Sequence, residues 1–219
     1  MDLIQTIIIA IVEGLTEFLP VSSTGHMIIT QNLLGVQQGN PFVHAFTFII
    51  QFGAILSVVC LYWKRFFQMR NYEEFISKMK FYGLLIVGVI PAVVVGLAAK
   101  KSGLLDRLLD SVEVVAVMLV LGGIFMLFCD RIFNMGREEN KVTCKRAFFI
   151  GLFQCLSVIP GMSRSMSTIV GGMQQKLTRK NAAEFSFFLA VPTMAGATLL
   201  DLIEMFGEDT KWATSNNIM

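Results

Sequence analysis

Residues 11–28 read IVEGLTEFLPVSSTGHMI, a polar cluster inside a stretch that is otherwise largely apolar from residue 3 to residue 34. Glu13 and Glu17 interrupt this stretch first, and Pro20 then precedes a run of hydroxyl side chains. Proline removes a backbone donor and disfavours helical geometry in the residue before it. Residues 3–34 therefore predict two short helices joined by a break, rather than one continuous helix.

The composition is that of a membrane protein. Hydrophobic residues make up 54% of the 219 residues, charged residues only 16%, and the mean hydropathy is +0.65. A soluble domain usually carries about 25% charged residues. The net charge of +2 and the lack of a basic tract argue against a nucleic-acid partner. The four scattered cysteines form no CxxC pair, which argues against a zinc site or a disulfide framework.

Residues 147–173 repeat the design of residues 3–34, because an apolar stretch again breaks at a proline, Pro160, that small polar residues follow. Non-helical backbone at membrane depth is tolerated only where protein or a water-filled cavity covers it. Re-entrant hairpins meet that condition. We therefore expect both stretches to be re-entrant helical hairpins.

Four other segments are apolar and close to the roughly 20 residues that cross a bilayer. They are residues 41–63, 81–99, 112–129 and 185–200. With the two hairpins, they predict an all-α polytopic membrane protein in which residues 1–219 form a single membrane domain.

The basic residues predict the orientation. Residues 64–80, 130–147 and 176–181 contain thirteen Lys and Arg residues, and they share one side if each hairpin returns to its starting side. The opposite side holds four: Lys100, Lys101, Arg107 and Lys211. Cytoplasmic loops carry an excess of Lys and Arg. We therefore expect the N-terminus and the first hairpin outside, with the second hairpin entering from the cytoplasm.

The hairpins also predict an inverted-topology repeat, in which each unit is a re-entrant helical hairpin followed by spanning helices. The first unit, residues 1–133, has three spanning helices, and this odd number inverts its copy. The second unit, residues 147–206, has only one, so it is incomplete and indicates a chain truncated at the C-terminus. Inverted repeats place a binding site at the interface between the units, near the midplane.

The first polar motif predicts a functional site. Glu13 and Glu17 lie four residues apart on one helical face. An ionisable residue inside a membrane segment costs roughly 2.5–3.5 kcal/mol and indicates function by default; solvated acids at a helix end are the alternative. Residues 22–26, Ser-Ser-Thr-Gly-His, then open a helix, where free amides and the dipole attract anions. Ordinary capping would explain only one of these hydroxyls.

Arg164 is the centre of the second polar motif. It stands between Ser163 and Ser165, far from other charges in the sequence. Its guanidinium presents a fork of donors that suits phosphate oxygens, and it stays protonated. A structural ion pair with Glu13 or Glu17 is the alternative interpretation, and it is compatible with phosphate binding.

Residues 12–26 resemble the first signature of the bacterial undecaprenyl-diphosphate phosphatases, a family also known for bacitracin resistance. Residues 160–165, with Thr168 after them, resemble the second signature. The resemblance covers essentially the whole chain. Two residues depart from the family's pattern, because Met166 stands where Gly is usual and Thr47 stands where an acid is common.

This resemblance implies an enzyme that converts undecaprenyl diphosphate to undecaprenyl phosphate and inorganic phosphate. That reaction recycles the lipid carrier of peptidoglycan synthesis and confers bacitracin resistance. The resemblance also implies a multi-pass protein of the bacterial inner (plasma) membrane with a site that faces the outer side. We expect a divalent cation, Mg²⁺ or Ca²⁺, and no organic cofactor, while a homodimer stays open. The alternatives are a transporter or flippase of an anionic polyprenyl-phosphate lipid and, more distantly, a purely structural membrane protein.

The residues of both motifs receive predicted roles. Ser23 is expected to be the nucleophile, with His26 as its base or as the leaving-group acid, although a water nucleophile stays open. Glu17 is expected to orient His26 or to help hold a metal. The expected catalytic residues are Glu17, Ser23, His26 and Arg164, the expected substrate-binding residues are Glu13, Ser22, Thr24, Gly25, Gly161, Ser163, Ser165 and Thr168, and the expected metal ligands are Glu13 and Glu17.

Overall fold

The structure, a computed structural model, describes residues 1–37, 40–103, 112–133 and 136–207. Its helices are α1 (Leu3–Thr16), α2 (Ser23–Leu33), α3 (Pro41–Leu61), α4 (Trp63–Phe67), α5 (Tyr72–Lys101), α7 (Val112–Phe133), α8 (Cys144–Gln154), the 3-10 helix η1 (Cys155–Val158), α9 (Arg164–Gln174) and α10 (Arg179–Gly207). The described ranges contain no strand. The predicted all-α fold is therefore confirmed.

Four of these helices, α3, α5, α7 and α10, are long and apolar enough to cross a membrane. Three of the predicted spanning segments lie within these helices, and the fourth, residues 41–63, extends two residues beyond the end of α3 at Leu61. In addition, α5 begins at Tyr72 rather than at residue 81, and α10 begins at Arg179 rather than at residue 185. The extra turns carry charged residues, which a helix accommodates but the hydrocarbon core does not. The apolar pattern thus predicts the part of each helix at membrane depth, not its full length.

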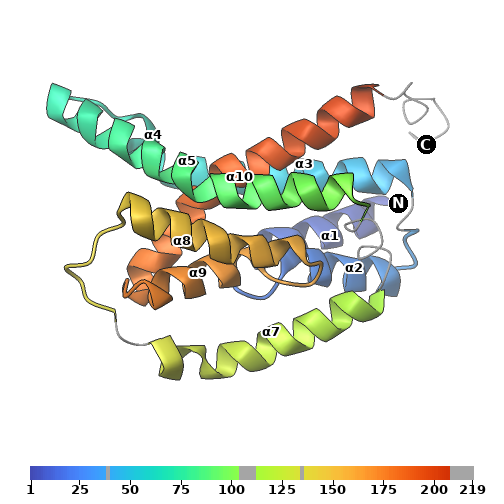
Figure 1. The fold of residues 1–219 in the computed structure, drawn as a ribbon. Coiled ribbons are helices and arrows are strands. Elements are labelled where there is room, and N and C mark those ends of the chain that lie inside the picture. The colour runs from blue at the N-terminus through green and yellow to red at the C-terminus, as the bar shows by residue number, and fades with distance from the viewer. Residues whose placement is uncertain (38–39, 104–111, 134–135, 208–219) are drawn as a thin grey trace.

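Two helical hairpins form the centre of the molecule (Figure 1). The first consists of α1 and α2, with 14 and 11 residues, and the second of α8 and α9, with 11 residues each. At 1.5 Å per residue these helices are only about 16–21 Å long, which is shorter than the roughly 30 Å hydrocarbon core. The hairpins point toward each other, and their tips meet where the Ser165 hydroxyl donates to the Leu19 carbonyl at 2.6 Å.

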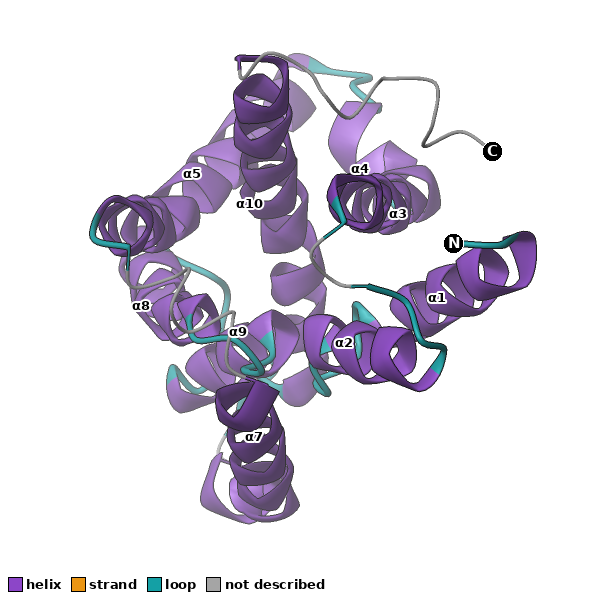
Figure 2. Ribbon diagram, turned by 90° about the vertical axis from the view of Figure 1, so that its right-hand side faces the viewer, coloured by secondary structure: helices purple, strands orange, loops and turns teal. Residues whose placement is uncertain are grey.

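The second hairpin is held against the spanning helices by close packing. α8 runs along α5 (Figure 2), and a Cβ on Gly151 would lie 2.2 Å from the carbonyl oxygen of Gly88 on α5. On α10, the Phe188 ring meets Phe66 and Phe81 edge-to-face, at centroid distances of 5.6 and 5.1 Å. These contacts fix α10 relative to α5. By contrast, α7 stands at the edge of the molecule, beside α9 and α2.

The connections between helices gather at two ends of the molecule. Residues 62–71 between α3 and α5, residues 136–143 before α8 and residues 175–178 before α10 lie at one end, on the left in Figure 1. The N-terminus and residues 34–37 after α2 lie at the other end. This is the grouping on which the predicted charge asymmetry rests, although Arg107 and Lys211 lie outside the described residues.

Candidate active site

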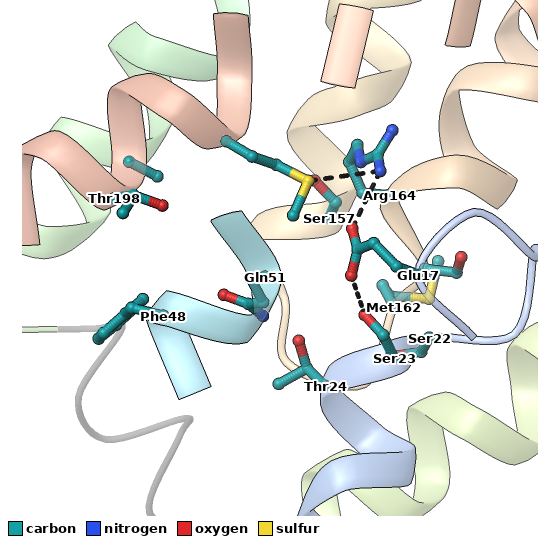
Figure 3. A pocket seen from close by; sticks show the side chains of 13 residues that line it. Glu17, Ser22, Ser23, Thr24, Phe48, Gln51, Ser157, Met162, Arg164 and Thr198 are labelled. Carbon is teal, nitrogen blue, oxygen red and sulfur yellow. Dashed lines mark hydrogen bonds and ion pairs between the residues drawn. The ribbon is translucent and has the colours of Figure 1, made fainter. Parts of the chain in front are cut away.

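A polar cavity of about 270 Å³ lies where the two hairpin tips meet α3 and α10 (Figure 3). Its walls come from the first tip, the second tip, α3 and α10. The lining residues are Glu17, Ser22, Ser23, Thr24, Phe48, Gln51, Ser157, Met162, Ser163, Arg164, Met194, Ala197 and Thr198. A polar cavity among helices of membrane-spanning composition is the arrangement expected of a site that accepts a charged group.

A chain of three polar side chains forms the floor of this cavity. The Arg164 Nη2 donates to Glu17 Oε1 at 3.0 Å, with the two side chains only 12% and 5% exposed. The Ser23 hydroxyl donates to the other oxygen of the same carboxylate, Oε2. Glu17 therefore links a cation from the second hairpin to a hydroxyl of the first (Figure 3). The ion pair that sequence analysis offered as an alternative for Arg164 is present.

The break after α1 places these groups. Glu17 is the C-cap of α1, and Ser23 is the first residue of α2. Between them Ser22 has φ 63° and caps α2, its side chain accepting from the Gly25 amide at 3.4 Å. Positive φ is uncommon for a residue other than glycine, and such strain persists where surrounding structure enforces it, often at functional sites.

Arg164 is positioned by groups on α9 and α10. Its Nη1 donates to the Ser186 carbonyl at 3.2 Å, and the Ser186 hydroxyl pairs with Thr168 Oγ1 at 2.6 Å. Its Nη2 also lies 3.5 Å from the sulfur of Met194. The buried Nε has no acceptor among the described residues. The guanidinium is thus pre-oriented beside the cavity by contacts from two helices.

Two helix N-termini open on the cavity. α2 begins with Ser23 and Thr24, and α9 begins with Arg164 behind its N-cap, Ser163. All four residues line the cavity. Helix N-termini present free amides and a partial positive charge, so both favour an anion at the same place.

His26 does not line this cavity. Its ring Nδ1 lies 2.8 Å from the Ser22 carbonyl, and because a carbonyl only accepts, Nδ1 is the donor of this hydrogen bond. The predicted pairing of Ser23 with His26 is replaced by the Ser23–Glu17 hydrogen bond. The His26 ring therefore bonds to the carbonyl of Ser22, four residues earlier in the chain, and not to the Ser23 hydroxyl.

Five residues with a predicted substrate-binding role do not line the cavity: Glu13, Gly25, Gly161, Ser165 and Thr168. A Cβ on Gly25 would lie 2.8 Å from Leu119 of α7, and Gly161, with φ 89°, contacts α7 so closely that a Cβ would lie 2.6 Å from a carbonyl oxygen. Both glycines therefore allow α7 to pack on the tips. Ser165 and Thr168 are buried, and their hydroxyls are bonded within the tips and to α10.

Sequence analysis missed the wall that α3, η1 and α10 provide. Gln51 and Thr198 face the tips across the cavity in Figure 3, and Ser157 precedes the second break. Gln51 makes no side-chain hydrogen bond within the described ranges. These residues stand singly in apolar segments, so nothing local indicated a site. The one signal available was the predicted repeat, in which a spanning helix directly follows each hairpin.

The comparisons with known proteins identify the family of the chain. The model of the family described as bacitracin resistance protein BacA matches residues 6–219. The chain belongs to this family. An undecaprenyl-diphosphatase from Porphyromonas gingivalis is 55% identical over 218 residues, which cover 95% of this chain and 76% of that protein. Proteins of the same name from Flavobacterium psychrophilum, 56% identical over 199 residues (91% and 71%), and Bdellovibrio bacteriovorus, 45% identical over 210 residues (94% and 75%), are also similar.

The two departures from the usual pattern of this bacitracin resistance family lie away from the cavity. Met166 is buried, and its Cε would contact a Cβ on Gly122 of α7 at 3.5 Å, so it fills space between α9 and α7. The Thr47 hydroxyl donates to the Val43 carbonyl at 2.9 Å and accepts from Gln31 at 3.4 Å. Neither residue lines the polar cavity.

Glu13 tests whether the expected divalent cation fits the residues present. It is 1% exposed, its Oε1 has no partner among the described residues, and its carboxyl interacts with that of Glu17. No cluster of three or more His, Cys, Asp or Glu residues occurs in the described ranges. Mg²⁺ is commonly held by one or two carboxylates with substrate phosphates and water. The Glu13–Glu17 pair fits such a site.

Proposed function

We propose that this chain hydrolyses undecaprenyl diphosphate to undecaprenyl phosphate and inorganic phosphate, which recycles the lipid carrier of peptidoglycan synthesis and confers bacitracin resistance. The names of its relatives support the substrate. The observation that carries the proposal is the Arg164–Glu17–Ser23 chain, which combines a phosphate-binding cation, a base and a hydroxyl in one cavity.

The diphosphate is bound by charge rather than by shape. Arg164 binds it with the donors that Glu17 releases, while the N-termini of α2 and α9 supply backbone amides. Phosphoryl transfer depends mainly on positioning and on stabilising charge in the transition state. Because the apolar helices exclude water, these pre-oriented groups act more strongly than they would in solution.

The Ser23 hydroxyl is the proposed nucleophile and Glu17 its base. Glu17 takes the hydroxyl proton as Ser23 Oγ attacks the terminal phosphorus. The bond from this phosphorus to the bridging oxygen then breaks, and undecaprenyl phosphate leaves with the proton from Glu17. In the second step Glu17 takes a proton from water, the resulting hydroxide attacks the phosphoserine, and Ser23 regains its proton as inorganic phosphate departs.

A water molecule is the alternative nucleophile. In that mechanism Glu17 deprotonates water directly, and Ser23 only orients the carboxylate through the hydrogen bond that it donates. The two mechanisms predict different covalent chemistry, since only the first forms a phosphoserine.

A divalent cation, Mg²⁺ or Ca²⁺, would be held by Glu17 and Glu13. When bound, it would neutralise charge on the phosphate oxygens. Arg164 alone cannot neutralise a diphosphate, and the unpartnered oxygen of Glu13 leaves a ligand position free among the described residues.

We also propose the bacterial inner membrane as the location, with the cavity open to the outer side. The support is the thirteen basic residues at the end that the positive-inside rule assigns to the cytoplasm. A transporter or flippase of an anionic polyprenyl-phosphate lipid is the less favoured function, because transport gives no reason for a hydroxyl bonded to a buried carboxylate.

The test is release of inorganic phosphate from undecaprenyl diphosphate by the detergent-solubilised protein. We expect turnover by the parent protein and its loss in Arg164→Ala, with Arg131→Ala, an exposed arginine of α7, as the matched control. Binding of the lipid without phosphate release would contradict the phosphatase proposal and favour transport.

A further inference from the structure

A second polar cavity, of about 320 Å³, lies between α4 and the first turns of α5. Its wall carries four cations, Lys64, Arg65, Arg70 and Lys78, and a single acid, Glu74. These side chains therefore give the cavity a formal charge of +3, from four positive charges and one negative charge. The catalytic proposal uses none of them.

The cavity is organised by contacts of its own. The Arg65 guanidinium lies 5.2 Å from the centroid of the Phe81 ring, and the Lys78 ammonium donates to the Lys64 carbonyl at 3.1 Å. Glu74 accepts from the backbone amide of Arg70 at 2.8 Å. Within the described ranges none of the four cations forms a salt bridge. Within the cavity wall only Glu74 offsets the four cations, so most of the positive charge is not neutralised by the described residues.

The position of the cavity matches the level of lipid headgroups. α5 has 30 residues and is about 45 Å long, whereas the hydrocarbon core is about 30 Å thick. Its first turns, which line the cavity, precede the apolar part that begins near Phe81. Trp63, Phe67 and Tyr72 stand beside the cavity in the chain and are 53%, 59% and 77% exposed. Exposed aromatic side chains of this kind anchor proteins at the membrane–water interface.

We propose that this cavity binds the phosphate headgroup of an anionic phospholipid from the leaflet at the basic end of the molecule. The phosphate would meet Arg65, Arg70 and Lys78, while the acyl chains would stay in the bilayer beside α5. A lipid without net charge would gain less, because its own cation meets a cavity that is already positive. Basic pockets between membrane helices bind anionic headgroups by this chemistry.

Fluorescence quenching of Trp63 tests the proposal. The chain has two tryptophans, so the full chain with Trp212→Phe reports Trp63 alone. The protein is reconstituted in phosphatidylcholine vesicles that contain either brominated phosphatidylglycerol or, at the same fraction, brominated phosphatidylcholine. We expect the anionic lipid to bind beside Trp63 at least fivefold more tightly than the neutral lipid, since one basic residue near the surface contributes about that factor.

The variant Arg65→Gln with Arg70→Gln separates the cavity from general surface charge. Both arginines are exposed and their side chains make no hydrogen bond in the described structure, so folding should be retained. We expect this variant to lose at least fivefold of the preference. The matched control, Arg131→Gln with Arg137→Gln, removes the same charge at the same end from exposed positions outside the cavity and should keep the preference.

Three results would overturn the proposal. The first is equal quenching by both brominated lipids in the parent protein. The second is an equal loss of preference in the control variant, which would assign the effect to general electrostatics. The third is a preference abolished by millimolar inorganic phosphate at constant ionic strength, which would identify a site for soluble anions.

Discussion

The two hairpin tips share a backbone design and differ in charge. Each tip turns after a proline, and each begins an 11-residue helix behind a serine N-cap, Ser22 or Ser163. The first tip carries an acid before the break, Glu17, whereas the second carries a cation after it, Arg164. The shared backbone provides two helix N-termini for an anion, and the side chains divide the roles, with the base and hydroxyl on one tip and the phosphate-binding cation on the other.

The largest expected effect comes from removing the charge of the second tip. Arg164→Ala should lower kcat by about a thousandfold or more, because a guanidinium that stabilises a transferring phosphoryl group contributes that much. Arg164→Lys should recover only part of the loss, since an ammonium cannot make the forked contacts of Arg164. Phosphate release measures both, and size-exclusion chromatography checks folding, because Arg164→Ala leaves Glu17 without its partner. Near-normal turnover in a folded Arg164→Ala protein would remove Arg164 from the site.

The charge of the first tip should matter next most. Glu17→Gln keeps the shape of the side chain but removes the base, and Ser23→Ala removes the hydroxyl. Each should lower kcat by about a hundredfold to ten-thousandfold, the usual contribution of acid–base catalysis. A phosphoserine trapped in the parent protein would establish the covalent mechanism. An active Ser23→Ala protein beside an inactive Glu17→Gln protein would instead establish water as the nucleophile.

A variant of His26 tests whether a residue of the first tip that does not line the cavity contributes to catalysis. Its Nδ1–H is held by the Ser22 carbonyl at 2.8 Å, and the ring does not line the cavity. Because Glu17 carries the proton transfers of the proposed mechanism, we expect His26→Ala to lower kcat by less than about tenfold and to leave the pH dependence of kcat unchanged. A loss of about a hundredfold, together with an ionisation missing from the pH profile, would instead give His26 a proton-transfer role.

The sequence predicted the fold well because the main signals were local. Four apolar segments, two prolines inside apolar stretches and two polar motifs were each visible within about thirty residues. The meeting of Glu17 with Arg164, 147 residues apart in the chain, could be inferred only because charges inside membrane helices need partners. The residues that bind the anion were harder to predict, since Gly25, Gly161 and Ser165 look like anion ligands but serve contacts between elements.

The sequence could not predict which partner a single side chain faces. Ser23 turned toward Glu17 rather than His26, and spacing along a helix does not decide between two acceptors. Gln51 entered the site from α3 because that helix passes the tips, which depends on packing between helices rather than on any motif. The sequence therefore predicts the charged residues of a site between two hairpins. It does not predict the residues that other helices contribute to the opposite wall.

The smallest expected effect concerns the backbone of the two tips. Ser22 has φ 63°, whereas Ser163 has φ −79° and ψ 123°, an ordinary extended conformation. Replacing an N-cap serine by glycine costs only a few tenths of a kcal/mol, but at Ser22 glycine would also relieve a left-handed conformation that costs about 1 kcal/mol or more. We therefore expect Ser22→Gly to be about 1 kcal/mol more stable than Ser163→Gly in thermal unfolding in detergent. Equal stabilities would mean that Ser22 carries no strain, and that the two tips differ in charge alone.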